Sequence, residues 1–286
     1  MDGRARLALS LLPNLVFAFV ISGLLHTEAR AASLTVVTAF APETATPTPG
    51  VWYEAAVVGG GTASTVNLAG AGGQLESAQP LPVGAALLTT GAANADIAHV
   101  AVVDAYGNAG SILADASLEI GYSFYKGSAG DLNAFAAPAF RLTFSNPSAV
   151  GDGYGSLVYE PYWQTSAIAP VPTDQWLTAA ITSTSGSFWW DGGFGEPNSF
   201  GGPPLRTLSE WASVFNADFA TAELVAAGVG VGSYNQGQTG YFDDVQISYT
   251  GYSAGYDFEP IPEPSSGLLL LFGLIGLRRS RSLRRG

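Results

Sequence analysis

Apolar and polar residues alternate with a period of two in several runs along the middle of the chain. In residues 117–125 every second position is apolar: Leu118, Ile120, Tyr122 and Phe124. Successive side chains of a strand point to opposite faces, so this run predicts a strand with one buried face. The same alternation predicts strands over 139–145, 175–182 and 226–233. Residues 97–103 are largely apolar and predict a strand buried on both faces.

A further strand is predicted over 241–249. Its buried face is expected to hold Tyr241, Val245, Ile247 and Tyr249. The face opposite to it is expected to hold Asp244, Gln246 and Ser248.

One short helix is predicted among these strands, over 208–215. Thr207 and Glu210 have the spacing of a capping box, and Leu208, Trp211 and Phe215 fall on one helical stripe. Strand runs separated by glycine turns, without alternating helices, favour an antiparallel two-sheet sandwich. The predicted fold is therefore all-β, a sandwich of the jelly-roll type with one short helix. A signal helix and a hydrophobic helix are expected to flank it at the two ends.

The first residues of the chain have the pattern of a secretory signal peptide. Arg4 and Arg6 precede an apolar stretch over 7–25, and Ala29-Arg30-Ala31 provides small residues for cleavage. The alternative is an anchor helix that is not cleaved. In either case the region that follows is expected to be exported.

The end of the chain falls into three zones. Pro262-Glu263-Pro264 comes first, an apolar run over 265–277 follows, and five arginines lie within 278–285. As a helix the run would cover roughly 20 Å, against ~30 Å for a hydrocarbon core, so it is short for a stable span. The arginines predict a cytoplasmic C-terminus, with the bulk of the chain on the other side of the membrane.

This order of zones resembles the PEP-CTERM sorting signal of Gram-negative bacteria. The resemblance covers residues 262–286 and includes the literal motif Pro262, Glu263 and Pro264. It implies transient anchoring in the inner membrane, cleavage near the motif, and delivery to the cell surface or extracellular matrix. The partners it implies are an exosortase-type processing enzyme, signal peptidase with the general secretion machinery, and the exopolysaccharide of the matrix.

The region between the two terminal segments is strongly acidic. Residues 32–261 hold 20 Asp or Glu and three basic residues, a net charge near −17, against −12 for the whole chain. Such a surface repels polyanions, so no nucleic-acid partner is expected. The chain has no cysteine, which excludes disulfides and thiolate metal sites. We divide the chain into a signal peptide (1–31), a β-sandwich domain (32–250), a linker (251–261) and the sorting signal (262–286).

The segment 187–202 is rich in aromatic residues and glycine. Trp189 and Trp190 are consecutive, so on a strand they face opposite sides, and at least one is exposed or lies under a loop. Aromatic faces beside polar groups suit sugar rings and their hydroxyls. The alternative is that these aromatic residues only seal the end of the sandwich. The candidate ligand-binding residues are Trp189, Trp190, Asp191, Phe194, Glu196 and Asn198.

A second motif, in residues 240–247, contains the consecutive carboxylates Asp243 and Asp244. It resembles the final strand of jelly-roll domains of the carbohydrate-binding and lectin-like kind. Asp243 shares a face with Val245 and needs a partner, which is either a backbone donor or a cation. A structural hydrogen-bonding role is the first hypothesis. The second is a structural calcium ion, although two carboxylates supply few of its six to eight oxygen ligands. No other cofactor is expected.

Signals for catalysis are weak. Glu160 lies among aromatic residues, where burial could raise its pKa as in a glycosidase acid, but hydrolysis needs a second carboxylate at a set distance. His99 is the one histidine of residues 32–261, and no Gly-x-Ser-x-Gly motif accompanies it. We assign no catalytic residue. The sequence favours a non-catalytic exported sandwich that binds polysaccharide. The alternative is a secreted polysaccharide hydrolase or lyase on the same sandwich.

Overall fold

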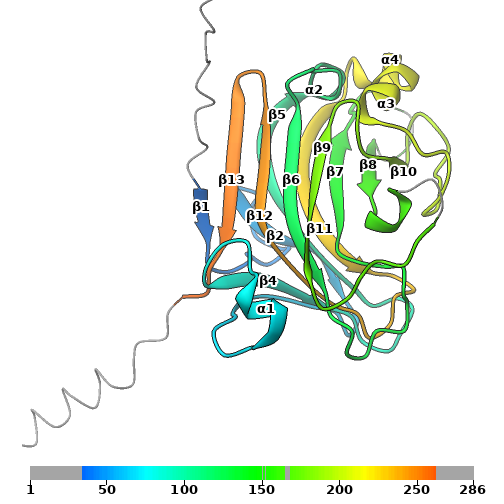
Figure 1. Cartoon of the computed structure of the whole chain (residues 1–286). Helices are drawn as coiled ribbons and strands as arrows, with labels where there is room; N and C mark the ends of the chain where they lie inside the picture. Colours follow the sequence, from blue (N-terminus) through cyan, green and yellow to red (C-terminus); the bar gives the residue numbers. More distant parts are fainter. Residues whose placement is uncertain (1–33, 150, 152, 165–167, 262–286) are drawn as a thin grey trace, which may run out of the picture. The chain divides into compact units, whose positions relative to one another are not determined.

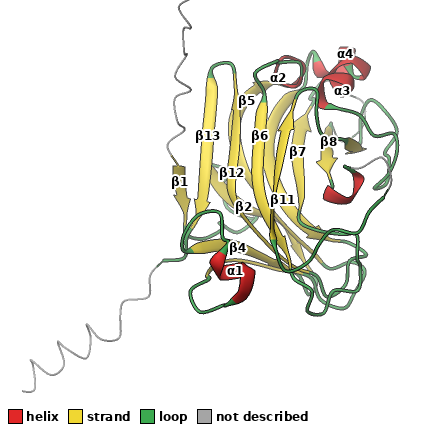
Figure 2. Cartoon of the chain, in the orientation of Figure 1, coloured by secondary structure: helices red, strands yellow, loops and turns green. Residues whose placement is uncertain are grey.

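Two β-sheets lie face to face and enclose an aromatic core (Figure 1, Figure 2). The computed structural model describes residues 34–149, 151, 153–164 and 168–261. The predicted signal peptide, the Pro262-Glu263-Pro264 motif and the tail that follows it lie outside the described residues. Among the residues described, no helix is long and apolar enough to cross a membrane.

The first sheet has seven strands and is organised around β12, which pairs with β6 and also with β4 and β13. One edge of β12 pairs with β6 along most of its length. The other edge of β12 pairs first with β4 and then, after the middle of the strand, with β13. The strands are β1 (Leu34–Val37), β3 (Thr62–Asn67), β4 (Gly84–Thr89), β6 (Glu119–Lys126), β9 (Trp176–Thr182), β12 (Thr239–Tyr249) and β13 (Tyr252–Phe258). Only the β1–β13 pair is parallel among the strand pairs of the described chain.

The second sheet has six antiparallel strands in the order β10-β8-β7-β11-β5-β2. They are β2 (Val51–Val58), β5 (Ile97–Asn108), β7 (Ala139–Ser145), β8 (Tyr154–Tyr159), β10 (Phe188–Gly192) and β11 (Glu223–Gly232). Two sheets, antiparallel except for the β1–β13 pair, packed on one core confirm the predicted sandwich. The jelly-roll type stays a prediction.

The core consists of the inward faces that the alternation predicted. Leu118, just before β6, and Ile120, Tyr122 and Phe124 within it are at most 4% exposed. In β7 the buried residues are Phe140, Leu142 and Phe144. Trp52 of the opposite sheet packs edge-on against Tyr256 and Phe258, with ring centroids 5.4 and 5.0 Å apart. Since fully burying such a ring stabilises the fold by about 1.5–3 kcal/mol, these contacts hold the two sheets together.

Three helices cover one end of the sandwich, at the top of Figure 1. They are α2 (Ala109–Leu113), α3 (Leu208–Val214) and α4 (Asn216–Phe219). The predicted capping box of α3 is confirmed, with Thr207 and Glu210 bonding each other's backbone N–H groups. The expectation of one short helix is wrong, because α1 (Gly73–Ser77) and the 3-10 turn η1 (Pro161–Trp163) also occur.

Two further predictions need correction. A bulge at Asp243 and Asp244, where Asp244 has φ 51°, shifts the alternation of β12. Before the bulge Phe242 is therefore the buried residue, and Tyr241 packs on the outer face against Tyr125. Residues 251–261 are not a linker, because most of them form β13, whose hydrogen bonds to β12 and β1 place it inside the sheet.

Candidate functional site

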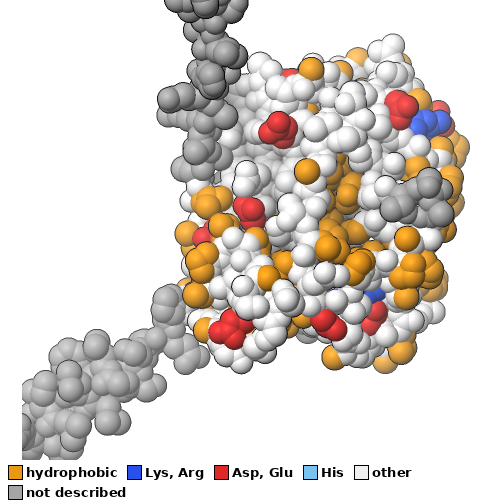
Figure 3. Space-filling model, in the orientation of Figure 1, with side chains coloured by type: hydrophobic (Ala, Val, Ile, Leu, Met, Phe, Trp, Pro, Cys, Tyr) orange, Lys and Arg blue, Asp and Glu red, His pale blue; other side chains and the backbone are white. Residues whose placement is uncertain are grey.

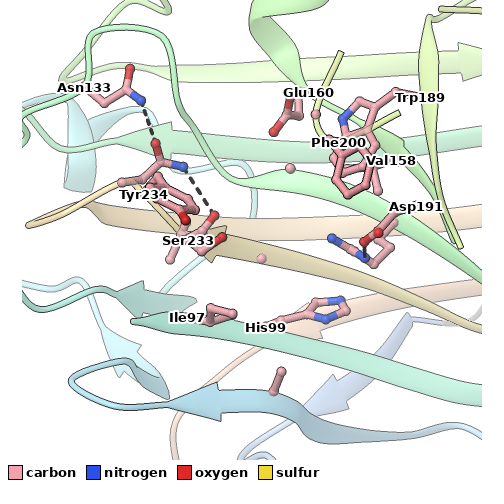
Figure 4. Close-up of a pocket in the computed structure, with 18 of the residues that line it drawn as sticks. Ile97, His99, Asn133, Val158, Glu160, Trp189, Asp191, Phe200, Ser233 and Tyr234 are labelled. Atoms are coloured by element: carbon pink, nitrogen blue, oxygen red, sulfur yellow. Dashed lines mark hydrogen bonds and ion pairs between the residues drawn. The ribbon is translucent and has the colours of Figure 1, made fainter. Parts of the chain in front are cut away.

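A cleft of about 660 Å³ lies on the outer face of the second sheet (Figure 4). Its floor is β11, where Val229 and Val231 point into the core and Gly228, Gly230 and Gly232 face outward. A Cβ at Gly228 would lie 2.4 Å from the Val100 carbonyl oxygen and 2.8 Å from Nε2 of His99. The backbone of β5 and the His99 ring therefore pack directly against this glycine face, and Gly230 and Gly232 line the cleft.

The strand register places Trp189, Val158, Arg141 and Gly228 in one row across β10, β8, β7 and β11. Trp189 is the outward-facing member of the tryptophan pair and lines the cleft. Trp189 is 7% exposed, and Phe200 of the following loop lines the same cleft.

Trp190 and Phe194 are core residues and do not bind ligand from the surface. Trp190 is fully buried, its ring centroid is 4.6 Å from that of Phe215, and its Nε1 donates to the Phe194 carbonyl oxygen at 3.2 Å. Phe194 is 4% exposed. For these two residues the alternative of aromatics that seal the end of the sandwich is correct. Glu196 lines a separate hollow beside Asp218.

Asp191 and Asn198 do reach the cleft, where they form a network with Arg141. Arg141 Nη1 donates to Asp191 Oδ2 at 2.8 Å, and Asn198 Nδ2 donates to Asp191 Oδ1 at 2.6 Å. The Asp191 carboxylate thus bridges a strand of the sheet and the loop that follows β10.

Two exposed aromatic residues stand on the loops that border the cleft. Phe200 is 89% exposed and Tyr234 is 72% exposed, and both line the cleft. Both also have a left-handed backbone, with φ of 51° and 62°. This conformation is costly for bulky residues and persists only where the surroundings impose it. Here the Phe200 N–H donates to Asn198 Oδ1, at 2.7 Å, and the Tyr234 N–H to the Asn94 carbonyl oxygen, at 2.8 Å.

The wall beside Tyr234 is fixed by a buried lysine. Lys126 is fully buried, its Nζ donates to the Asn133 carbonyl oxygen at 2.5 Å, and it pairs with Asp131 at 3.0 Å. Asn133 Nδ2 in turn donates to Asn235 Oδ1 at 2.6 Å, next to Tyr234. This wall is thereby ordered before any ligand arrives.

Three buried polar atoms among the lining residues lack a well-formed hydrogen bond to the rest of the described chain: His99 Nε2, Glu160 Oε2 and Trp189 Nε1. Their residues come from β5, from the end of β8 and from β10 (Figure 4). Burial lowers the pKa of His99 to about 3, helped by the nearby Arg141, so the imidazole is neutral near pH 7. Burial raises the pKa of Glu160 above its ordinary value. Tyr162 and Trp189 still lie close enough to the Glu160 carboxyl group to lower its pKa, against the larger effect of burial. Unpaired buried polar groups are costly, so each of these atoms would gain by bonding a ligand.

Asp243 and Asp244 lie away from the cleft, at the bulge of β12. Asp243 is fully buried and its Oδ1 accepts from the Phe258 N–H at 3.1 Å. Burial raises the pKa of Asp243 to about 8. Asp244 Oδ1 accepts from Gln246 Nε2 at 2.7 Å. Within the described part of the chain, no three His, Cys, Asp or Glu residues are grouped to hold a metal ion. The contacts of Asp243 fit the hydrogen-bonding hypothesis.

No protein-family model and no curated protein matches this chain. Among solved structures, it is similar to a family 11 carbohydrate-binding module from Clostridium thermocellum in complex with a β-1,3-1,4-mixed-linked tetrasaccharide. The identity is 16%, the match covers 68% of this chain and 86% of that chain, and the TM-score is 0.36. A second similar structure is the family 11 module of the cellulase Lic26A-Cel5E of Clostridium thermocellum, with 14% identity, coverage of 77% and 96%, and a TM-score of 0.38. Likenesses at this level identify no ligand for this chain.

The sequence interpretation found one side of the cleft and missed the others. Trp189, Asp191 and Asn198 were found because they are close together in the sequence. Arg141, His99 and Tyr234 come from other strands and loops, and which strands become neighbours cannot be read from alternation. The signal that could have helped is the repeat Gly228-Val229-Gly230-Val231-Gly232, since a strand with glycine on its whole outer face indicates that something packs closely there.

Proposed function

We propose that this chain is an exported surface or extracellular-matrix protein whose β-sandwich, of the jelly-roll type, binds polysaccharide in the cleft. The observation that carries the proposal is the combination of exposed aromatic residues on the rims with buried polar atoms below them that lack a well-formed hydrogen bond. Phe200 and Tyr234 are held in costly conformations although neither is needed by the core. Such strain at an exposed position points to a ligand contact.

The chemistry of the lining suits sugars. Aromatic faces pack against the C–H faces of pyranose rings, and Phe200 and Tyr234 offer such faces above the largely buried Trp189. Sugar hydroxyls both donate and accept hydrogen bonds. The indole N–H of Trp189 is a donor, Glu160 Oε2 is an acceptor, and His99 supplies a further ring nitrogen. A volume of about 660 Å³ lies in the usual range of ligand sites and has room for a short oligosaccharide.

Binding can be tested by affinity electrophoresis of the full chain, in mild detergent, through gels that contain single polysaccharides. We expect retardation by at least one neutral polysaccharide. Trp189→Ala and Phe200→Ala should each weaken it about tenfold, because a stacking contact of ~1–1.5 kcal/mol is lost. Val214→Ala, which removes an exposed apolar side chain on α3, is the control and should bind as the wild type does. Equal retardation of all variants, or none by any polymer, would exclude the cleft as a glycan site.

We also propose that the tail sorts the protein by a PEP-CTERM/exosortase-type route. Intact mass and cell fraction of the mature protein test this together. The expected product lacks the signal peptide and the residues beyond the Pro262-Glu263-Pro264 motif and lies at the surface or outside the cell. Replacing all three motif residues by alanine should leave the tail uncut, whereas Ser282→Ala should be processed normally. A full-length chain in the cytosol, with both ends intact, contradicts the proposal.

The alternative of a polysaccharide hydrolase or lyase has one observation in its favour, the raised pKa of Glu160. The other carboxylate among the lining residues is Asp191, whose register partner Ser156 lies four residues from Glu160. This places the two backbones roughly 13 Å apart along the sheet at ~3.3 Å per residue. Both oxygens of Asp191 already accept hydrogen bonds, from Arg141 and from Asn198, so binding is the better supported function. If the wild type releases reducing ends from a polysaccharide and Glu160→Gln does not, hydrolysis becomes the better supported function.

A further inference from the structure

The cleft contains a single basic side chain among its lining residues, and that side chain is already neutralised. Arg141 pairs with Asp191 through a contact of 2.8 Å, in which the two side chains are 29% and 37% exposed. The pair therefore lies within reach of a ligand. Asn198 holds the second carboxylate oxygen, so Asp191 stays in place opposite the guanidinium.

The remaining lining groups offer a negatively charged ligand no positive charge to pair with. His99 is neutral near pH 7 because burial lowers its pKa to about 3. Glu160 can contribute only negative charge or none. The region 32–261 has a net charge near −17, and acidic side chains are scattered over the face shown in Figure 3. Two like charges a few ångströms apart near a protein surface repel by several kcal/mol, so this field disfavours polyanions.

We propose that Asp191 makes the cleft selective for uncharged glycans, because it occupies Arg141 in the place that the carboxylate of a uronic acid would otherwise take. This inference rests on the proposed function and specifies the substrate class of the same site. An arginine fork binds carboxylates in a bidentate way, so an unpaired Arg141 would be an anion site. Asp191 removes that site while leaving the aromatic rims and the hydroxyl-binding atoms available.

The test compares one polymer in two charge states. Affinity electrophoresis first identifies the neutral polysaccharide that retards the full chain most. The same polymer is then oxidised at C6 to the uronic acid, and the two forms are compared. The wild type is expected to bind the neutral form and to bind the oxidised form at least tenfold more weakly. Asp191→Asn frees Arg141 and should gain at least tenfold in affinity for the oxidised polymer. Because the gain is electrostatic, it should fall when NaCl is raised from 50 to 500 mM.

Two further variants isolate the cause. Glu119→Gln removes one negative charge from an exposed position on β6, in the other sheet, and should leave binding of the oxidised polymer unchanged. Adding Arg141→Gln to Asp191→Asn should abolish the gain, which a general loss of negative charge would not do. Melting temperatures of all variants show whether each is folded.

The possible outcomes separate the two proposals. If the wild type binds the oxidised polymer as well as the neutral one, or if Asp191→Asn gains nothing, the selectivity inference is overturned and the glycan site stands. If neither form of any polymer binds, the proposed function itself fails. A gain in Asp191→Asn that needs Arg141 supports both.

Discussion

At the scale of single residues, Asp243 is a buried acid that ties two strands together. It is fully buried at the bulge of β12, and its Oδ1 accepts from the backbone of β13. Its other oxygen, Oδ2, has no hydrogen-bond partner among the described residues. A carboxylic acid in this setting is better accommodated protonated than ionised, and burial accordingly raises the pKa of Asp243 to about 8.

This shift makes stability depend on pH. Unfolded, the carboxyl group titrates near 3.9, so between pH 4 and 8 the unfolded chain has released a proton that the folded chain keeps. The stabilisation that protonated Asp243 provides is therefore complete below pH 4, and it is lost as the pH rises towards 8. His99 acts in the opposite sense, since its lowered pKa costs stability only as pH falls below about 6.5. Between pH 6.5 and 8, therefore, His99 adds little to the pH dependence of the free energy of unfolding.

We expect the free energy of unfolding to fall by about 1.5 kcal/mol from pH 6.5 to 8, and Asp243→Asn to remove most of that fall. Urea unfolding at pH 6.5, 7.2 and 8 in EDTA measures both. Glu119→Gln, an exposed carboxyl on β6, should keep the wild-type slope. A flat profile in the wild type would contradict a protonated Asp243. A melting temperature that rises on addition of CaCl₂ would instead make it an ion ligand.

At the scale of elements, the glycine face of β11 forms the floor of the cleft. An added Cβ at Gly228 would meet the backbone oxygen of Val100 at 2.4 Å, and backbone cannot move out of its way cheaply. At Gly230 the nearest atoms are Cβ, Cδ2 and Cγ of His99, at 3.2–3.3 Å, and they need to shift by only a few tenths of an ångström. The two positions are two residues apart on the same face of one strand, so they form a matched pair.

Gly228→Ala is expected to destabilise the protein by about 3 kcal/mol, because the sheet must shift to admit the methyl group. Gly230→Ala should change stability by less than ~1 kcal/mol. Thermal or urea unfolding of the two variants gives the comparison. Equal effects at the two positions would mean that β11 and β5 are not packed as closely as the structure places them.

How well the elements could be predicted depended on whether the sequence alternated without interruption. The predicted strand 139–145 coincides with β7 because Phe140, Leu142 and Phe144 alternate with polar residues throughout. In β12 the bulge at Asp243 and Asp244 adds a residue, and a fixed period then puts Tyr241 on the wrong face. The linker predicted over 251–261 is wrong because β13 has the strand pattern too, with Tyr256 and Phe258 buried at alternate positions.

At the scale of the whole molecule, the two ends of the described chain meet at one edge of the first sheet. β1 begins at Leu34 and pairs in parallel with β13, which ends at Phe258. The Glu259 N–H then donates to the Val37 carbonyl oxygen at 3.0 Å. The sandwich therefore closes only when the last strand is present, and only residues 259–261 separate it from Pro262. Cleavage near the motif would leave the closed domain whole.

The boundary of the folded domain gives the last prediction. A chain that ends at residue 250 loses β13, and with it Tyr256, Phe258 and the hydrogen bonds to β12 and β1. Removing each aromatic ring from a packed core costs about 3–5 kcal/mol, and a domain of this kind is stable by about 5–15 kcal/mol in all. We therefore expect the chain ending at 250 to show no cooperative melting, whereas one ending at 261 should melt in a single sharp transition. Calorimetry and near-UV circular dichroism, which reports packed tryptophans such as Trp52, distinguish these outcomes. If both chains melted alike, β13 would be dispensable and residues 251–261 would be a linker after all.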